Sequence, residues 1–177
     1  ISAFGYNSKS GKLDFINHQN PNGLNPCYVI NDDKNVITAN YSSGNISVLG
    51  KNIDGSIGEA KQLVQHTGKS INTNRQEAAH AHMVYFSPDK KYVLANDLGT
   101  DKVYVYQYNP NSQTEVLKLK SSVNCTPGSG PRHLIFSNDG KYVYVLQELD
   151  GVISSFSYTD GVLEKRSETS IVSADFN

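Results

Sequence analysis

The sequence has no tryptophan, one methionine and only two cysteines among its 177 residues. Cys27 and Cys125 are too few for a disulfide framework and form no C-x-x-C motif, so we interpret them as buried or free thiols. The 16 basic residues are balanced by 17 acidic ones, which excludes the basic excess of a nucleic-acid or anionic-membrane surface. No apolar run approaches the roughly 18 residues of a membrane helix. We therefore expect neither a nucleic-acid partner nor a membrane partner.

Helical periodicity is also missing. No segment carries apolar residues at i, i+3, i+4 and i+7, which is the pattern of an amphipathic helix. Instead, short apolar runs rich in valine, isoleucine and tyrosine are separated by Asn-Gly, Asp-Gly and Ser-Gly turns. This pattern predicts an all-β fold of short strands.

The short runs recur with a period of about 50 residues. Residues 88–96 read PDKKYVLAN and residues 138–146 read NDGKYVYVL, so that Asp139 follows Asp89 by 50 residues. An earlier copy, DDKNVITAN, occupies 32–40, and the opening ISAFGY of 1–6 returns as ISSFSY at 153–158. A repeat of roughly 40–50 residues with about four short strands is typical of a β-propeller blade. A β-sandwich would explain the regular strand spacing but not the internal repeat.

We therefore predict that residues 1–177 are part of a single β-propeller domain built from four-stranded antiparallel blades. Residues 1–22 would form the end of one blade, and 26–68, 78–123 and 130–168 would form three successive blades. Propellers usually need about four to eight blades to close. We expect the chain to be about half of a longer propeller, with the remainder supplied by missing sequence or by a second chain.

Two irregular loops precede inner strands and are the places to look for chemistry. They cover residues 65–82 and 125–133. His82 and Arg132 lie 50 residues apart, which equals the repeat, so they should occupy matching positions on adjacent blades. Matching positions of successive blades gather around one rim of the central channel, and we expect these two side chains to meet there.

The histidines allow two interpretations. His80 and His82 are two positions apart, so both would face the same way in an extended segment. Such a pair could bind a metal with His133 or Glu148 as a third ligand, but nothing in the spacing requires a metal and we predict none. The alternative is that one of the pair, His80 in particular, is a hydrogen-bonded structural residue.

Four charged residues also stand out. Arg132 follows Gly-Ser-Gly-Pro, which suits bidentate binding of a carboxylate or phosphate, although an inter-blade salt bridge would also explain it. Glu148 ends an otherwise apolar strand, and its alternative is a solvated loop acid. Asp97 and Asp101 flank the corresponding turn of the previous blade, and we interpret them as turn residues.

Taken in order, three motifs resemble the lactonase family of seven-bladed propellers. They are HAHMVYFSPDKKYVLANDLGTD at 80–101, GPRHLIF at 130–136 and QEL at 147–149. The family includes propeller-type bacterial 6-phosphogluconolactonase and the fungal 3-carboxy-cis,cis-muconate lactonizing enzyme. The resemblance implies about half of a seven-bladed ring, with His82 (or His80), Arg132 and Glu148 as catalytic groups at one end of the channel. A further basic residue of the family would lie on a later blade, outside this sequence.

The resemblance implies hydrolysis of a sugar lactone, specifically 6-phosphogluconolactone to 6-phosphogluconate. We expect Arg132, His133 and His80 to contact this small anionic substrate, with no cofactor. Two alternatives stay open: a carboxymuconate-type lactonizing enzyme that uses the same residues, and a non-catalytic binding platform. The hydrolase role implies the cytoplasm, with a periplasmic or secreted location as the alternative.

Overall fold

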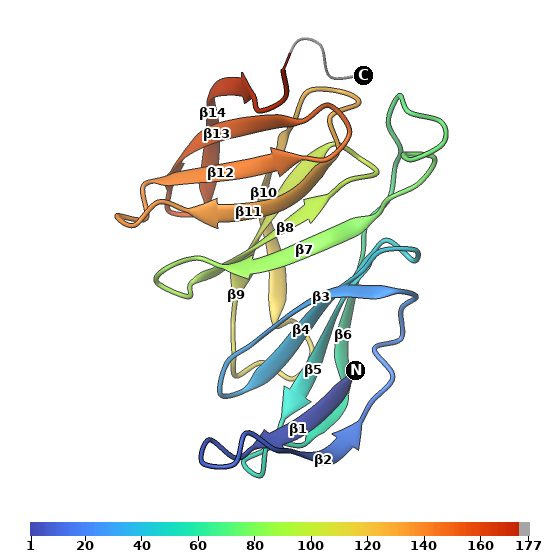
Figure 1. The fold of residues 1–177 in the computed structure, drawn as a ribbon, viewed down its shortest axis with the longest axis vertical. Helices are drawn as coiled ribbons and strands as arrows, with labels where there is room; N and C mark the ends of the chain where they lie inside the picture. The colour runs from blue at the N-terminus through green and yellow to red at the C-terminus, as the bar shows by residue number, and fades with distance from the viewer. Residues whose placement is uncertain (174–177) are drawn as a thin grey trace.

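The computed structural model describes residues 1–173, which form fourteen strands joined by turns and loops (Figure 1). The strands are β1 (Ser2–Tyr6), β2 (Leu13–His18), β3 (Pro26–Asn31), β4 (Asn35–Asn40), β5 (Asn45–Lys51), β6 (Ile57–Gln65), β7 (Ala81–Phe86), β8 (Tyr92–Asp97), β9 (Lys102–Tyr108), β10 (Leu117–Asn124), β11 (Pro131–Phe136), β12 (Tyr142–Gln147), β13 (Val152–Thr159) and β14 (Val162–Ser170). Within these residues there is no helix of the length and apolarity needed to cross a bilayer.

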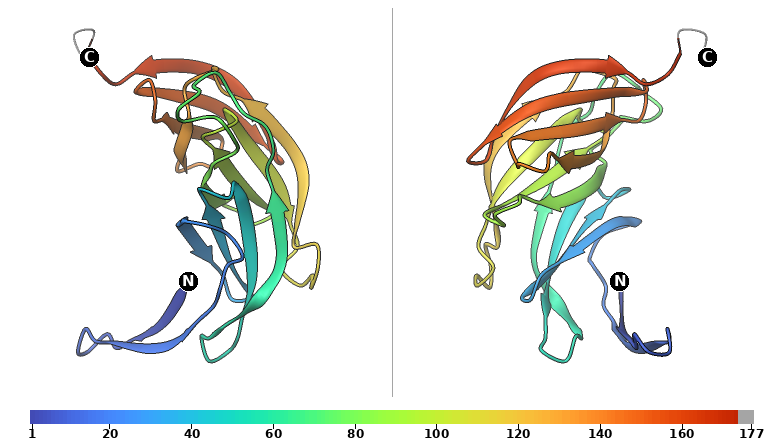
Figure 2. Two further views of the ribbon diagram at one scale, coloured as in Figure 1. Left: turned by 90° about the vertical axis from the view of Figure 1, so that its right-hand side faces the viewer. Right: turned by 60° about the vertical axis from the view of Figure 1, so that its left-hand side comes forward.

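The strands form three four-stranded antiparallel sheets and one two-stranded sheet. Their orders are β3-β4-β5-β6, β7-β8-β9-β10, β11-β12-β13-β14 and β1-β2. The sheets follow one another along a curved arc, and β7 contacts both β3 and β11 (Figure 2). This is the arrangement of consecutive propeller blades and confirms the predicted all-β propeller architecture. The outer strands β10 and β14 continue to Asn124 and Ser170, just beyond the proposed blade ends at 123 and 168.

The repeated sequence encodes a repeated turn at the start of the second strand. In the Ser87–Tyr92 turn, the Ser87 hydroxyl donates to Asp89 at 2.7 Å and accepts the Tyr92 amide at 3.0 Å. The turn from Ser137 to Tyr142 has the same two bonds at 2.7 and 3.0 Å. These side-chain bonds replace backbone partners that a tight turn cannot supply, which explains why the motif recurs with the blade.

Packing between sheets buries the central strands on both faces. Every residue of β4 and of β8 is buried, the polar residues at the strand ends included, as expected for strands that are covered on both faces. Val93 packs in the cluster shared with the β3–β6 sheet, and its neighbour Leu94 packs in the cluster shared with the β11–β14 sheet. The β12 strand instead alternates between buried and exposed residues, because in the described part of the chain only one face of its sheet is covered.

Replacing Leu94 by alanine should destabilise the fold strongly. Its side chain is fully buried between two sheets, and deletion of such a group costs about 2–5 kcal/mol of unfolding free energy. The matched control is Leu119→Ala on β10, where the side chain is 58% exposed and the cost should stay below about 1 kcal/mol. Urea unfolding of the intact protein measures both. Equal losses for the two variants would contradict this description of the core.

Candidate functional site

Each inner strand carries the same irregularity at its second residue. The pairing register with the neighbouring strand shifts there, leaving an extra residue at Cys27 in β3, at His82 in β7 and at Arg132 in β11. Such a bulge turns a side chain away from the regular alternation of the strand. All three side chains line one hollow of about 770 Å³. His82 and Arg132 therefore do occupy matching positions on adjacent sheets, and Cys27 is a third member of the set that the sequence analysis missed.

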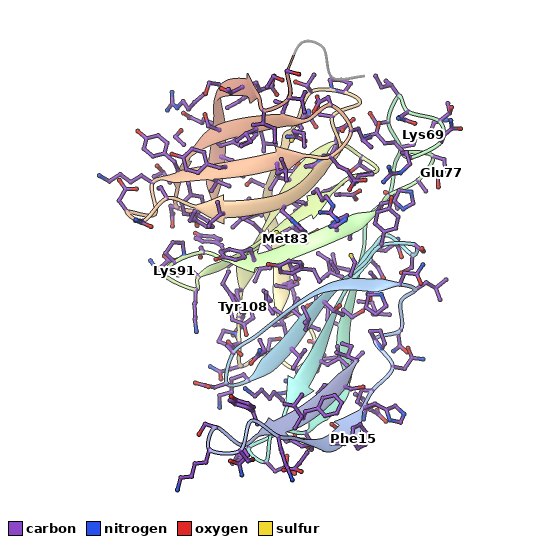
Figure 3. The ribbon with its side chains drawn as sticks, in the orientation of Figure 1. Phe15, Lys69, Glu77, Met83, Lys91 and Tyr108 are labelled. Carbon is purple, nitrogen blue, oxygen red and sulfur yellow. The ribbon has the colours of Figure 1, made fainter. Side chains whose placement is uncertain are left out.

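The rest of the hollow comes from the ends of second strands and from one loop. Tyr41 and Glu148 directly follow β4 and β12, and their amides make equivalent bonds to the carbonyls of Asn25 (3.0 Å) and Gly130 (2.8 Å). Arg75 reaches the hollow from the long loop between β6 and β7, which projects beside the start of β7 where Lys69 and Glu77 are labelled (Figure 3). The full lining is Asn25, Pro26, Cys27, Tyr41, Arg75, His82, Arg132 and Glu148.

The Glu148 carboxylate is the meeting point of the charged groups. Arg132 Nε lies 2.8 Å from Glu148 Oε2, an ion pair without an aligned hydrogen bond. Arg75 Nη2 donates to Glu148 Oε1 from the opposite loop. His82 Nε2 stands 3.8 Å from Glu148 Oε2. The three residues expected to share one site are thus in contact or nearly so, and the sequence analysis did not single out Arg75.

The ionisation of the site follows from burial and from the two guanidinium groups. Burial alone would raise the pKa of Glu148, but the hydrogen bond from Arg75 and the charges of Arg75 and Arg132 lower it overall, so the carboxylate is ionised. Burial, followed by repulsion from Arg132 and His133, lowers the pKa of His82 to about 4. Burial and Arg132 also lower the pKa of His133. At neutral pH the site therefore contains a carboxylate, two guanidinium groups and neutral imidazoles.

Two residues expected to contact substrate lie outside this lining. His80 is buried, with Nδ1 3.0 Å from the Tyr41 carbonyl and Nε2 3.2 Å from Glu77, and its ring stacks on Tyr41 at 4.5 Å. Both ring nitrogens thus have protein partners, which favours the alternative of a hydrogen-bonded structural residue, and the contact of His80 with substrate stays a prediction. His133 packs edge-on against His82 at 5.3 Å and borders a separate apolar hollow.

A metal-binding arrangement is not present in the part of the chain that the structure describes. Among residues 1–173, no three His, Cys, Asp or Glu side chains lie close enough to hold a metal ion. The Cys27 thiol donates to the His82 carbonyl at 3.2 Å, and burial raises its pKa. This thiol therefore ties two inner strands together.

Comparison with known proteins decides the family. A family described as "Lactonase, 7-bladed beta-propeller" matches residues 1–177. The chain belongs to this lactonase family. A Bacillus subtilis protein named 6-phosphogluconolactonase is 40% identical over 176 residues, which is 98% of this chain and 49% of the relative. A Formosa agariphila protein of the same name is 32% identical, over 93% of this chain and 47% of the relative.

Solved structures of family members agree. A candidate 6-phosphogluconolactonase from Bacteroides fragilis superposes with a TM-score of 0.94 at 37% identity, covering 98% of this chain and 51% of that one. A periplasmic gluconolactonase from Pseudomonas aeruginosa gives a TM-score of 0.91 at 33% identity, covering 99% and 50%. The chain thus spans about half the length of the lactonase relatives it matches, in line with the expectation of half a ring.

The pKa of His82 should rise when Arg132 is replaced by glutamine. This change removes a positive charge that opposes protonation of the imidazole, while burial persists, so the pKa should move from about 4 toward, but not to, its ordinary value of 6.5. Histidine resonances followed by NMR between pH 3 and 8 measure it. Lys141→Gln, which removes a charge from the exposed β11–β12 turn, should leave the titration unchanged. An unaltered His82 titration in Arg132→Gln would show that the guanidinium is not placed as described.

Proposed function

We propose that the protein hydrolyses a sugar lactone, most specifically 6-phosphogluconolactone to 6-phosphogluconate, at the hollow around Glu148. The observation that carries this proposal is the placement of one carboxylate between two guanidinium groups and a neutral imidazole. Its chemistry supplies a base, an anion clamp and a hydrogen-bond donor, which ring opening of a lactone by water needs. The names of the B. subtilis and F. agariphila relatives point to the same reaction.

In the proposed reaction a water molecule attacks the lactone carbonyl carbon. Glu148 accepts one proton of that water as the new carbon–oxygen bond forms, and Arg132 stabilises the negative charge on the carbonyl oxygen. The ring carbon–oxygen bond then breaks, and the proton held by Glu148 passes to the ring oxygen, which leaves as a hydroxyl. The other proton of the water is then on the new carboxylic acid group, which releases it to solvent at neutral pH.

Arg75 is the group we assign to the substrate phosphate. It lies on a loop at the edge of the hollow, whereas Arg132 stands on a strand beside His82. A phosphate would compete with Glu148 for this guanidinium, since Arg75 can pair with either anion. Transfer of Arg75 to the phosphate removes a hydrogen bond that lowers the Glu148 pKa. The substrate would thereby make Glu148 a stronger base.

The imidazole of His82 acts in this scheme as a neutral hydrogen-bond donor. Its low pKa leaves no imidazolium to donate at neutral pH, so the proton shuttle is assigned to Glu148. His80 contributes by holding Tyr41 against the hollow, through the stack and the bond to the Tyr41 carbonyl. His133 acts through its contact with His82.

The compartment follows from the substrate. A phosphorylated lactone as the substrate favours the cytoplasm, which we propose for this protein. An unphosphorylated lactone would fit a periplasmic or secreted protein, and the P. aeruginosa relative is named as a periplasmic gluconolactonase. The preference of the protein for one of the two lactones therefore tests both the proposed substrate and the proposed compartment.

Glu148→Gln should lower kcat for 6-phosphogluconolactone by about 10²–10⁴-fold, because the amide cannot accept the proton of water. Stopped-flow measurement of acid release in the intact propeller, corrected for spontaneous hydrolysis, gives the rate. The control is Glu164→Gln, an exposed acid on β14 paired with Arg166, which should retain full turnover. Unchanged turnover in Glu148→Gln would remove this carboxylate from the mechanism. Conversion of a carboxymuconate in place of the lactone would favour the lactonizing alternative.

Arg75→Gln should raise KM for the phosphorylated lactone about tenfold and leave KM for unphosphorylated gluconolactone nearly unchanged. A charge-assisted bond to a phosphate contributes about 1.5–3 kcal/mol, and tenfold corresponds to about 1.4 kcal/mol. Lys69→Gln is the matched control, since it removes an exposed positive charge from the same loop outside the hollow. Equal effects of Arg75→Gln on both lactones would contradict the assignment of Arg75 to the phosphate.

A further inference from the structure

Asp101 occupies a backbone position that its counterparts in the other two four-stranded sheets give to glycine. It ends the turn between β8 and β9 with a positive φ of 52°, and the matching residues Gly44 and Gly151 have φ values of 62° and 65°. Glycine adopts this conformation without steric cost, whereas a residue with a Cβ does not. Something other than the turn itself must favour an aspartate here.

The Asp101 side chain is buried and fully engaged. Its Oδ1 accepts the Gly130 amide at 2.7 Å, and its Oδ2 accepts the Gly128 amide at 2.6 Å and the Ser70 hydroxyl at 2.5 Å. The residue is only 3% exposed. One carboxylate thus holds two separate loops, and none of these three bonds belongs to its own turn.

One of these loops leads into β11, which carries Arg132, and the other loop carries Arg75 itself. Gly128 and Gly130 belong to the loop that enters β11 directly before Arg132, and Ser70 belongs to the loop that carries Arg75. The second loop is also held to the same turn by Gln76, whose side-chain amide donates to the Leu98 carbonyl at 2.8 Å. The β8–β9 turn lies at the end of the sheets where β7 and β11 begin (Figure 1).

The other end of the turn is also held by hydrogen bonds to a carboxylate, that of Asp97. Asp97 Oδ1 accepts the amides of His80, Gly99 and Thr100 at 2.8–3.1 Å, and its Oδ2 accepts His66 Nδ1 at 2.8 Å. These hydrogen bonds hold the turn in place, so that Asp101 binds both loops from a defined position.

We propose that Asp101 is a positioning residue of the site, whose carboxylate places the loop before Arg132 and the loop that carries Arg75 so that both guanidinium groups converge on Glu148. It does not line the hollow and acts through the loops it binds. The role in catalysis rests on the proposed function, but the placement of Arg132 does not. This distinction sets the design of the test.

Asp101→Gly separates positioning from turn formation, because glycine suits the backbone and matches the other sheets. If Asp101 only formed the turn, the variant would equal or exceed the parent protein in stability and activity. With the positioning role, kcat/KM for the phosphorylated lactone falls at least tenfold in the folded, intact propeller. Displacement of Arg132 also raises the pKa of His82 from about 4 toward 6.5, which NMR measures without substrate.

The matched control is Asp160→Gly. Asp160 has a positive φ of 45° in the β13–β14 turn, and its carboxylate accepts the Tyr92 hydroxyl at 2.8 Å, remote from Glu148. The same chemical change there should leave kcat/KM within about twofold and the His82 titration unaltered. If Asp101→Gly does not fold, Asp101→Asn replaces it, since asparagine tolerates positive φ and loses part of the acceptor capacity.

Ser70→Ala tests the bond from Asp101 to the Arg75 loop separately from its bonds to the loop before Arg132. It removes only the bond to the Arg75 loop, so KM for the phosphorylated lactone should rise about threefold with kcat and the His82 pKa unchanged. The two proposals can fail separately. A wild-type protein without lactonase activity would refute the proposed function, and a raised His82 pKa in Asp101→Gly would still support the positioning role. Unchanged kcat/KM and unchanged His82 titration in Asp101→Gly would overturn the inference.

Discussion

The apolar packing of the β7–β10 sheet against its two neighbours is the constraint on which the site depends. Val93 and Leu94, adjacent in β8, enter different clusters on opposite faces, so one strand links three sheets. Burial on both faces fixes the distance and angle between successive inner strands. The second residues of these strands, Cys27, His82 and Arg132, are brought together as a consequence of that packing.

The site combines this rigid scaffold with groups held by loops. His82 and Arg132 stand on strands, and Glu148 follows the end of a strand, so the sheets set where the backbones of these residues lie. Arg75 comes from a loop and pairs with Glu148 across the hollow. A guanidinium on a loop can exchange partners at lower cost than one on a strand, which is why we give Arg75 the substrate phosphate and Arg132 the developing charge. The loop that carries Arg75 and the loop that leads into β11 before Arg132 are both bound to the β8–β9 turn through Asp101.

Charge and burial in the hollow together set the protonation states of Glu148 and His82. The guanidinium groups of Arg75 and Arg132 keep Glu148 ionised, whereas burial and the charge of Arg132 keep His82 neutral. Both pKa values are lowered, and the consequences differ: the carboxylate is charged and the imidazole is neutral at the same pH, which separates their roles. A carboxylate that gains basicity when one guanidinium leaves is matched to a substrate that carries its own anion.

The sequence alone determined the strands, their period and the blade architecture, because turn residues and apolar alternation are local and recur every 50 residues or so. The same period was enough to place His82 and Arg132 together. The sequence also singled out Glu148 as an acid at the end of an apolar strand, and the resemblance to the lactonase family supplied its catalytic role. Tertiary structure alone decided the parts that depend on non-local contacts. Arg75 lies in a loop that has no counterpart one repeat away in the sequence. The roles of His80 and His82 differ because their side chains contact different residues in the fold. Asp101 reads as a turn residue until its three partners from two distant loops are seen, because a side chain's hydrogen bonds across the fold leave no periodic trace in the chain.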